Sequence, residues 1–183
     1  MCIRDSFKTV DDRRISQLNF ENVGINADQI VATGDEAEQL IKDAINYGTL
    51  CVSAEAVGCM ESCYLKTVEY TKSREQFGQP ISNFQVLQHK MVDMFIEAEL
   101  CKSLLYKSMI DMHENNDSKY RSVSALKSQV GLSGKKVGED AVQLHGGMGV
   151  SEEMSIGHYL KRFISIDSQF GNSHFHLKKF NNS

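Results

Sequence analysis

Two short segments of this sequence combine residue types that suit an anionic ligand. The first, Arg74-Glu-Gln-Phe-Gly78, places a guanidinium before a glycine turn, and arginine can grip two phosphate oxygens at once. The second, Gln143-Leu-His-Gly-Gly-Met-Gly149, places a carboxamide before glycines that let a ligand approach the backbone. Each alone has an ordinary explanation, because arginines often cap helices and glycines often end them. Together, about 70 residues apart in a helical pattern, they indicate a binding site.

The other reactive side chains match no common catalytic pattern. A di-iron bundle requires Glu-x-x-His, and no glutamate here has a histidine three residues later. P-loop and Ser-His-Asp signatures are also missing. His174 and His176 are candidate metal ligands, but a solvated tail is the expectation for them. Cys59 and Cys63 are expected to be buried thiols, so we predict no metal site.

The composition is that of an ordinary globular chain. Of its 183 residues, 41% are hydrophobic and 24% are charged, which argues against disorder. The net charge of -4 disfavours a nucleic-acid partner. No apolar run approaches about 18 residues, so no membrane span is expected. The five cysteines form no CxxC pair and no secretory signal is evident, which predicts buried, reduced thiols and a cytoplasmic protein.

The first 33 residues need to be read in two parts. Residues 1–6, Met-Cys-Ile-Arg-Asp-Ser, resemble the translation of a transposon-end sequencing adapter. We therefore exclude them from the fold and expect the natural gene to continue upstream. Residues 7–33 show the short spacing of one or two strands, which are too few for a sheet of their own. They are expected to pair with a sheet that this chain does not contain.

Residues 34–183 show the apolar spacing of helices, and a single proline permits long ones. The first helix is expected over 34–73, with Asp35 as its N-cap, and the second from Ser82 or Asn83. The fourth is expected to begin near Ser151 and to give way to a basic tail after Gly171. The pattern predicts a mainly α fold, an up-down antiparallel four-helix bundle preceded by one or two β-strands.

The expected buried positions follow the same spacing. In the first helix they are small residues: Ala54, Ala56, Gly58, Cys59, Ser62 and Cys63. In the second they are Phe84, Leu87, Met91, Met94, Ala98, Cys101, Leu105 and Met112, and in the third Val123, Leu126, Val130, Val137, Ala141 and Leu144.

The chain resembles the C-terminal helical domain of the acyl-CoA dehydrogenase family, preceded by the last strands of that family's middle β domain. The similarity runs from about residue 13 to 180. It implies that residues 7–33 end the middle domain and that residues 34–183 form the helical domain, which contacts FAD across a subunit interface. The FAD contacts implied by the resemblance are Arg74, Gln76, Phe77, Gln85, Gln143, Leu144, His145, Gly146, Gly147, Asn172 and Ser173.

The sequence departs from the family at the catalytic base. The family has Glu-Gly-Thr-Ser-Gln where this chain has Phe170-Gly-Asn-Ser-His174, and phenylalanine cannot accept a proton. Some relatives carry the base on the first helix, but Tyr47-Gly48-Thr49 supplies no carboxylate there. Asp167 is either a displaced base or a surface acid paired with Lys161 or Arg162. The substrate contacts that the resemblance implies are Tyr47, Gly48 and Gly171.

The C-terminal segment resembles glutamate-lacking relatives, such as the small subunit of pimeloyl-CoA dehydrogenase and the paired dehydrogenases of steroid side-chain breakdown. The resemblance implies an FAD-dependent subunit that dehydrogenates an acyl-CoA thioester between Cα and Cβ. A homo- or hetero-oligomer is implied, such as a dimer of dimers, with a partner's glutamate as base and a flavoprotein as a possible electron acceptor. The alternatives are a non-catalytic structural subunit at the flavin interface and a flavin-free helical interaction module. This chain alone is expected to be inactive.

Overall fold

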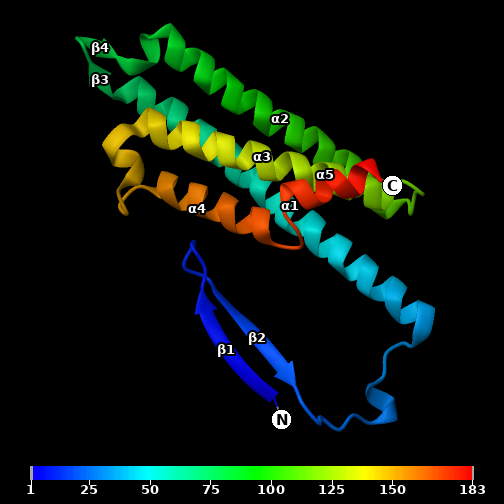
Figure 1. Cartoon of the computed structure of the whole chain (residues 1–183). Coiled ribbons are helices and arrows are strands. Elements are labelled where there is room, and N and C mark those ends of the chain that lie inside the picture. The colour runs from blue at the N-terminus through cyan, green and yellow to red at the C-terminus, as the bar shows by residue number, and fades with distance from the viewer. Residues whose placement is uncertain (1, 183) are drawn as a thin grey trace.

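A computed structural model describes the backbone of residues 2–182 and the side chains of residues 5–182. It contains a hairpin at the N-terminal end and a bundle of helices (Figure 1). The strands are β1 (Cys2–Lys8), β2 (Arg14–Phe20), β3 (Glu75–Gln76) and β4 (Gln79–Pro80). The helices are α1 (Gly34–Ser73), α2 (Gln85–His113), α3 (Lys119–His145), α4 (Ser155–Ser168) and α5 (Ser173–Asn181).

Helix α3 is the centre of the bundle, and the other four helices pack around it (Figure 1). All six apolar positions expected on its seam are buried, from Val123 to Leu144. Gly134 and Gly138 let α4 approach closely, because a Cβ at either position would stand 3.0 Å from ring atoms of Phe163. The mainly α bundle expected from the sequence is confirmed, with a fifth helix added to it.

The expected buried faces of α1 and α2 are confirmed in part. On α2, the seam from Met94 to Met112 is buried. On α1, Ala56 and Cys63 are buried but Gly58 is exposed. The buried positions of α1 recur every three or four residues, and Gly58 falls between two of them on the solvent side. Cys51 is also exposed, so the expectation that the cysteines are buried is wrong there.

Three helix ends differ from the expected ones. Helix α1 follows Thr33, and Asp35 lies in its first turn, where the helix dipole stabilises a negative charge. Ser82 and Asn83 lie in a 3-10 turn, η2 (Ile81–Asn83), so α2 begins only at Gln85. The expected start of α4 at Ser151 is four residues early, because Ser151 Oγ accepts the Glu153 N–H and shapes a turn instead.

The segment after Gly171 is a helix rather than a solvated tail. Asn172 caps α5, with its side chain accepting the Phe175 N–H at 2.8 Å. His176 is buried against the bundle and donates from Nε2 to the Phe170 carbonyl at 3.0 Å. Burial lowers the pKa of His176, which keeps its ring neutral near pH 7. No group of three or more potential metal ligands occurs among residues 5–182.

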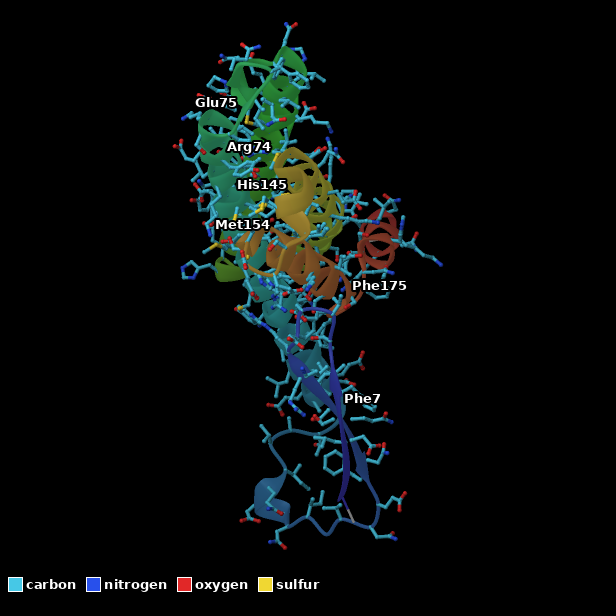
Figure 2. The ribbon with its side chains drawn as sticks, turned by 90° about the vertical axis from the view of Figure 1, so that its left-hand side faces the viewer. Phe7, Arg74, Glu75, His145, Met154 and Phe175 are labelled. Atoms are coloured by element: carbon cyan, nitrogen blue, oxygen red, sulfur yellow. The ribbon has the colours of Figure 1, made fainter. Side chains whose placement is uncertain are left out.

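Strands β1 and β2 form an antiparallel hairpin in which Cys2 stands opposite Phe20. Residues 2–6 therefore form most of strand β1, and their origin in an adapter stays a prediction. Every residue of β2 is exposed, and Figure 2 shows the hairpin extending away from the helices. The expectation that these strands pair with a sheet elsewhere stays a prediction.

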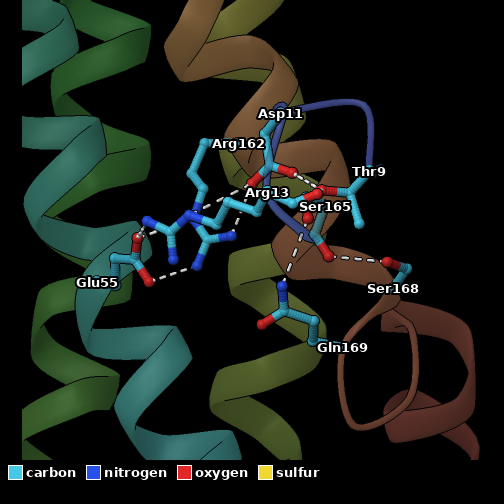
Figure 3. A network of polar contacts seen from close by, with 8 residues as sticks. All are labelled: Thr9, Asp11, Arg13, Glu55, Arg162, Ser165, Ser168 and Gln169. Atoms are coloured by element: carbon cyan, nitrogen blue, oxygen red, sulfur yellow. Dashed lines mark hydrogen bonds and ion pairs between the residues drawn. The ribbon is translucent and has the colours of Figure 1, made fainter. Parts of the chain in front are cut away.

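The turn of this hairpin is tied to the bundle by Arg162 on α4 (Figure 3). The Arg162 guanidinium donates to both carboxylate oxygens of Glu55 on α1, at 2.6 and 2.7 Å, and to Asp11 at 2.8 Å. Arg13 adds a second contact to Glu55 at 3.2 Å. The Arg162 and Asp11 side chains are only 10% and 5% exposed, whereas those of Glu55 and Arg13 are 34% and 60% exposed, so only the centre of this ion-pair network is buried. It joins three segments far apart in sequence.

No helix within residues 2–182 is both long enough and apolar enough to cross a membrane.

Candidate functional site

The two sequence motifs meet in one hollow at the end of the bundle where α1 and α3 both terminate. The hollow has a volume of about 400 Å³. Figure 2 shows Arg74 and His145 close to each other at this end. Its lining consists of Tyr70, Arg74, Gln76, Ile81, Gln143, Leu144, His145, Gly146, Gly147 and Met148. The two segments therefore lie side by side at one end of the bundle, and their role as a binding site stays a prediction.

Arg74 ends α1 through its backbone and leaves its side chain available. Its N–H donates to the Tyr70 carbonyl at 2.9 Å, and its own carbonyl accepts the Ile81 N–H at 2.8 Å. These two bonds hold the β3–β4 turn against the helix. The side chain is exposed, and within the described part of the chain no carboxylate forms an ion pair with it. The alternative was that the Arg74 guanidinium caps helix carbonyls. Among the described residues it donates no hydrogen bond to a helix carbonyl.

The glycines after α3 leave the backbone open to the hollow. Gly146 has a φ of +59°, a left-handed conformation that favours glycine. A Cβ placed on Gly146 or Gly147 would meet no atom within 4 Å. Packing within the described residues therefore does not explain why these two positions lack a side chain. A ligand that approaches the backbone closely would explain it.

His145 and Tyr70 form a stacked pair beside the hollow, with ring centroids 4.1 Å apart. His145 Nδ1 donates to the Ala141 carbonyl at 2.8 Å, so Nε2 carries the lone pair of the neutral ring. That Nε2 is buried and has no partner among the described residues. Burial lowers the pKa of His145, which favours this neutral form. An unpaired buried acceptor costs about 1–3 kcal/mol until a donor reaches it.

Four of the expected cofactor contacts lie outside this hollow. Phe77 is 92% exposed and meets the edge of Phe84. Gln85 is the exposed first residue of α2, while Asn172 and Ser173 lie at the turn between α4 and α5. Among the described residues nothing brings these side chains to the hollow, so their role stays a prediction. Sequence reasoning missed Tyr70, although it lies one helical turn before Arg74.

The turn between α4 and α5 is held from several directions. Lys127 of α3 is fully buried, and its Nζ donates to the carbonyls of Ile166, Asp167 and Gly171 at 2.9, 3.0 and 3.0 Å. Burial lowers the Lys127 pKa to about 8. These bonds satisfy carbonyls that the end of α4 leaves unpaired.

Phe170 sits in this turn with a φ of +57°, and its ring packs on α1 at Gly48. A Cβ at position 48 would stand 2.7 Å from Cζ of Phe170, so only glycine accommodates the ring there. Tyr47 is 51% exposed. Phe170 and Gly48, the two positions at which the resemblance implied a base, are thus in contact with each other, and neither supplies a carboxylate.

Asp167 has a structural partner in the same turn. Its Oδ1 accepts the Ser173 N–H at 2.9 Å, at the start of α5. The expected pairing with Lys161 or Arg162 is wrong, because Lys161 binds Glu152 and Arg162 binds Glu55 and Asp11. The 151–154 turn brings Glu152 to Lys161, whereas α1 and the hairpin bring Glu55 and Asp11 to Arg162. Whether Asp167 acts as a base stays a prediction.

Comparison with known proteins identifies the domain. A family profile described as the C-terminal domain of acyl-CoA dehydrogenase matches residues 39–178. The chain belongs to the acyl-CoA dehydrogenase family. This acyl-CoA dehydrogenase domain is 29% identical over 79% of its length to the short-chain specific acyl-CoA dehydrogenase of Megasphaera elsdenii. It is 32% identical over 70% of its length to the acyl-CoA dehydrogenase IpdE2 of Mycobacterium tuberculosis. It spans only 38% and 39%, respectively, of those two proteins.

Solved structures share its fold. Butyryl-CoA dehydrogenase of Megasphaera elsdenii superposes with a TM-score of 0.91, covering 97% of this acyl-CoA dehydrogenase domain and 47% of that chain, at 23% identity. The ChsE4–ChsE5 complex of Mycobacterium tuberculosis gives 0.90 at 22% identity, covering 99% and 48%. PigA with FAD and proline gives 0.88 at 22% identity, covering 98% and 48%. The PigA structure contains FAD, and the ChsE4–ChsE5 structure is a complex of two components.

Proposed function

We propose that this acyl-CoA dehydrogenase domain is the C-terminal part of a subunit that oxidises acyl-CoA thioesters between Cα and Cβ with FAD. The observation that carries the proposal is the single hollow that joins Arg74, Gln143 and the open glycine backbone at the ends of α1 and α3. When bound, FAD would supply the redox chemistry by accepting a hydride. The residues of this chain would bind and orient it.

The lining of the hollow fits the phosphate and adenosine end of FAD. A pyrophosphate is doubly anionic, and Arg74 offers an exposed guanidinium without a carboxylate partner among the described residues. Gly146 and Gly147 leave room for phosphate oxygens to approach the backbone. The buried Nε2 of His145 would accept a hydrogen bond from an adenosine N–H or hydroxyl after a small side-chain adjustment. The family resemblance implies that this FAD is bound mainly by a neighbouring chain and that Arg74 reaches it across the subunit interface, which makes an oligomer part of the proposal.

The catalytic base is proposed to come from a partner subunit in a hetero-oligomer, for instance a dimer of dimers. Phe170 and Gly48 contact each other and supply no carboxylate, and Asp167 is engaged by the Ser173 N–H. The fold shared with the two-component ChsE4–ChsE5 complex is in keeping with such an arrangement. The electron acceptor would be a flavoprotein, and the setting cytoplasmic.

A second candidate function is a non-catalytic subunit that only completes flavin sites on its partners. The packing of Phe170 on Gly48 favours it, because the ring fills the place where a substrate-facing carboxylate would be needed. Both candidates require the FAD-binding hollow, and they differ in whether substrate turns over at this subunit. A flavin-free interaction module would have no use for an unpaired Arg74 beside open glycines.

Replacing Arg74 by alanine in the assembled complex should weaken flavin retention by roughly 10–150-fold while the fold persists. A charge-assisted bond to phosphate contributes about 1.5–3 kcal/mol. Flavin dissociation constants, measured by fluorescence alongside melting temperatures, provide the test. The matched control is Lys72→Ala, which removes an exposed cation two residues earlier that pairs with Glu69. A lower melting temperature with unchanged flavin affinity would make Arg74 a structural residue only.

The isolated 183-residue chain should fold into helices yet retain little FAD. The hollow offers contacts only for the phosphate and adenosine end, and nothing among the described residues encloses a flavin ring. Absorbance near the flavin bands after purification, set against helical circular dichroism, measures this directly. A yellow protein with one flavin per chain would contradict it.

A further inference from the structure

Helix α5 is held on the bundle by a histidine rather than by an apolar side chain. It lies along α3 and is only nine residues long (Figure 1). Within α5 only Ser173 and His176 are buried, whereas Phe175 and Leu177 are 55% and 44% exposed. A helix this short is not stable in water by itself, so its position depends on what it buries. The docking of α5 on α3 therefore depends on His176.

The His176 ring makes one hydrogen bond and leaves its other nitrogen unpaired. The residue is 2% exposed, and its Nε2 donates to the Phe170 carbonyl at 3.0 Å. Its Nδ1 is buried and has no hydrogen-bond partner among the described residues. In the neutral ring Nδ1 carries a lone pair, and protonation would turn it into a donor without an acceptor. A buried, unpaired charge costs far more free energy than a buried lone pair.

The charges around His176 also oppose its protonation. Burial is the largest cause of its lowered pKa, and two cations lower that pKa further. They are Lys127 on α3, which is fully buried, and Lys179 on α5. The hydrogen bond to the backbone and the charge of Asp167 at the end of α4 act in the opposite direction. The Asp167 carboxylate is shared, however, because its Oδ1 accepts the Ser173 N–H.

Helix α1 adds no net negative charge at this position. Glu38 and Lys42 line one hollow together with His176, and their charges are opposite. With the groups named above, three lysines and two carboxylates face His176 from α1, α3, α4 and α5. An imidazolium ion would therefore enter a net positive environment, where like charges repel it.

We propose that α5 is a pH-dependent switch, which lies on α3 while the His176 ring is neutral and separates from α3 when that ring is protonated. Separation removes the partner of the Phe170 carbonyl, so the turn between α4 and α5 is released together with the helix. The rest of the bundle remains folded, because none of the described residues of its apolar core comes from α5. The switch goes beyond the proposed function and requires neither flavin nor a partner subunit.

The direction of the pH dependence follows from the two pKa values of His176. Its pKa is lowered when α5 is docked and returns to about 6.5 when α5 is separated. The docked state is therefore fully stable above about pH 6.5 and loses stability as pH falls toward the lowered value. Between these two values the opening constant of α5 should rise about tenfold per pH unit, because opening takes up one proton.

The test is amide exchange of the full chain between about pH 7.5 and about pH 5, corrected for the intrinsic exchange rate at each pH. Protonation of the His176 ring is followed by NMR in the same samples. Amides of α5 should exchange faster as pH falls below about 6.5, by about tenfold per pH unit, whereas amides in the core of α2 should stay protected.

Two pairs of variants separate the switch from general effects of acid. His176→Gln should abolish the pH dependence, because glutamine can donate to the Phe170 carbonyl but does not titrate. Its matched control is His174→Gln, an exposed position on the same helix, which should retain the dependence. Lys179→Gln should raise the pKa of the His176 ring, because it removes one of the opposing cations. The exposed neighbour Lys178→Gln should leave that pKa unchanged.

Four results would overturn the proposal. They are a His176 ring that titrates near pH 6.5 in the folded chain, exchange of α5 that stays constant with pH, equal acceleration in α2 and α5, and an unchanged pH dependence in His176→Gln. If α5 is already open at every pH in His176→Gln, the two lysine variants decide, and equal effects of Lys179→Gln and Lys178→Gln would overturn the proposal. None of these results depends on flavin binding at Arg74.

Discussion

Replacing Asp167 by asparagine is expected to leave acyl-CoA dehydrogenation within a few fold of the wild-type rate. In the proposed hetero-oligomer, replacing the glutamate that the partner subunit would supply by glutamine should lower that rate by roughly 10²–10⁴-fold, the usual contribution of a general base. The physical reason is geometric. The Asp167 carboxylate already accepts the Ser173 N–H at 2.9 Å, and position 170 offers only a phenyl ring packed on Gly48. Flavin bleaching by acyl-CoA in single turnover measures both variants.

The control for this experiment is Asp117→Asn, which changes an exposed acid in the turn between α2 and α3. Melting curves should accompany the kinetics, since Asp167→Asn weakens a bond at the start of α5 and lowers stability without acting on chemistry. If Asp167→Asn abolished bleaching while the partner variant retained it, this chain would carry its own base. The proposed division of labour between subunits would then be wrong.

Replacing Arg162 by methionine should destabilise the chain by about 3 kcal/mol and release the hairpin from the bundle. Removing one partner from a buried ion pair leaves an uncompensated charge, which typically costs about 3–5 kcal/mol. The lower end applies here because Glu55 is 34% exposed and Arg13 still contacts it. Chemical denaturation gives the free energy of unfolding, and amide exchange in β1 and β2 reports whether the hairpin has come loose.

The matched control is Lys161→Met on the same helix, which removes an exposed pair with Glu152 and should cost less than about 1 kcal/mol.

The contribution of Arg162 to stability should also depend on pH. The bond to Arg162 lowers the pKa of Glu55, and bonds from Thr9 and Arg162 lower that of Asp11 despite its burial. The stabilisation is therefore complete above about pH 4.5 and lost as pH falls through the folded-state values. Equal destabilisation by Arg162→Met and Lys161→Met would show that the Arg162 network contributes no more to the free energy of unfolding than an exposed ion pair does.

The helices were predictable because their cores repeat at helical spacing. The α3 seam from Val123 to Leu144 and the α2 seam from Met94 to Met112 were read directly from apolar residues three and four apart. Helix ends were less predictable. Asp35, Asn83 and Ser151 all have good capping side chains, yet backbone turns at η2 and at residues 151–154 determined where α2 and α4 begin.

The candidate site was predictable only as two segments. Arg74 and Gln143 to Gly147 were identified by residue type and spacing. That they share one hollow, together with the Tyr70–His145 stack, follows from the packing of α1 on α3. The C-terminal segment was misread as a tail because α5 is short and polar, and its stability depends on the N-cap at Asn172 and on the burial of His176 against the bundle.

The sequence by itself determined the helical bundle, the family resemblance and the presence of a phenylalanine at position 170, since these depend on local spacing and residue identity. Only the tertiary structure decided the partners of the charged side chains. Arg162 pairs with Glu55 and Asp11, and Lys127 is buried against three carbonyls. Such pairings join residues 39 to 151 positions apart, and spacing along the chain carries no information about them.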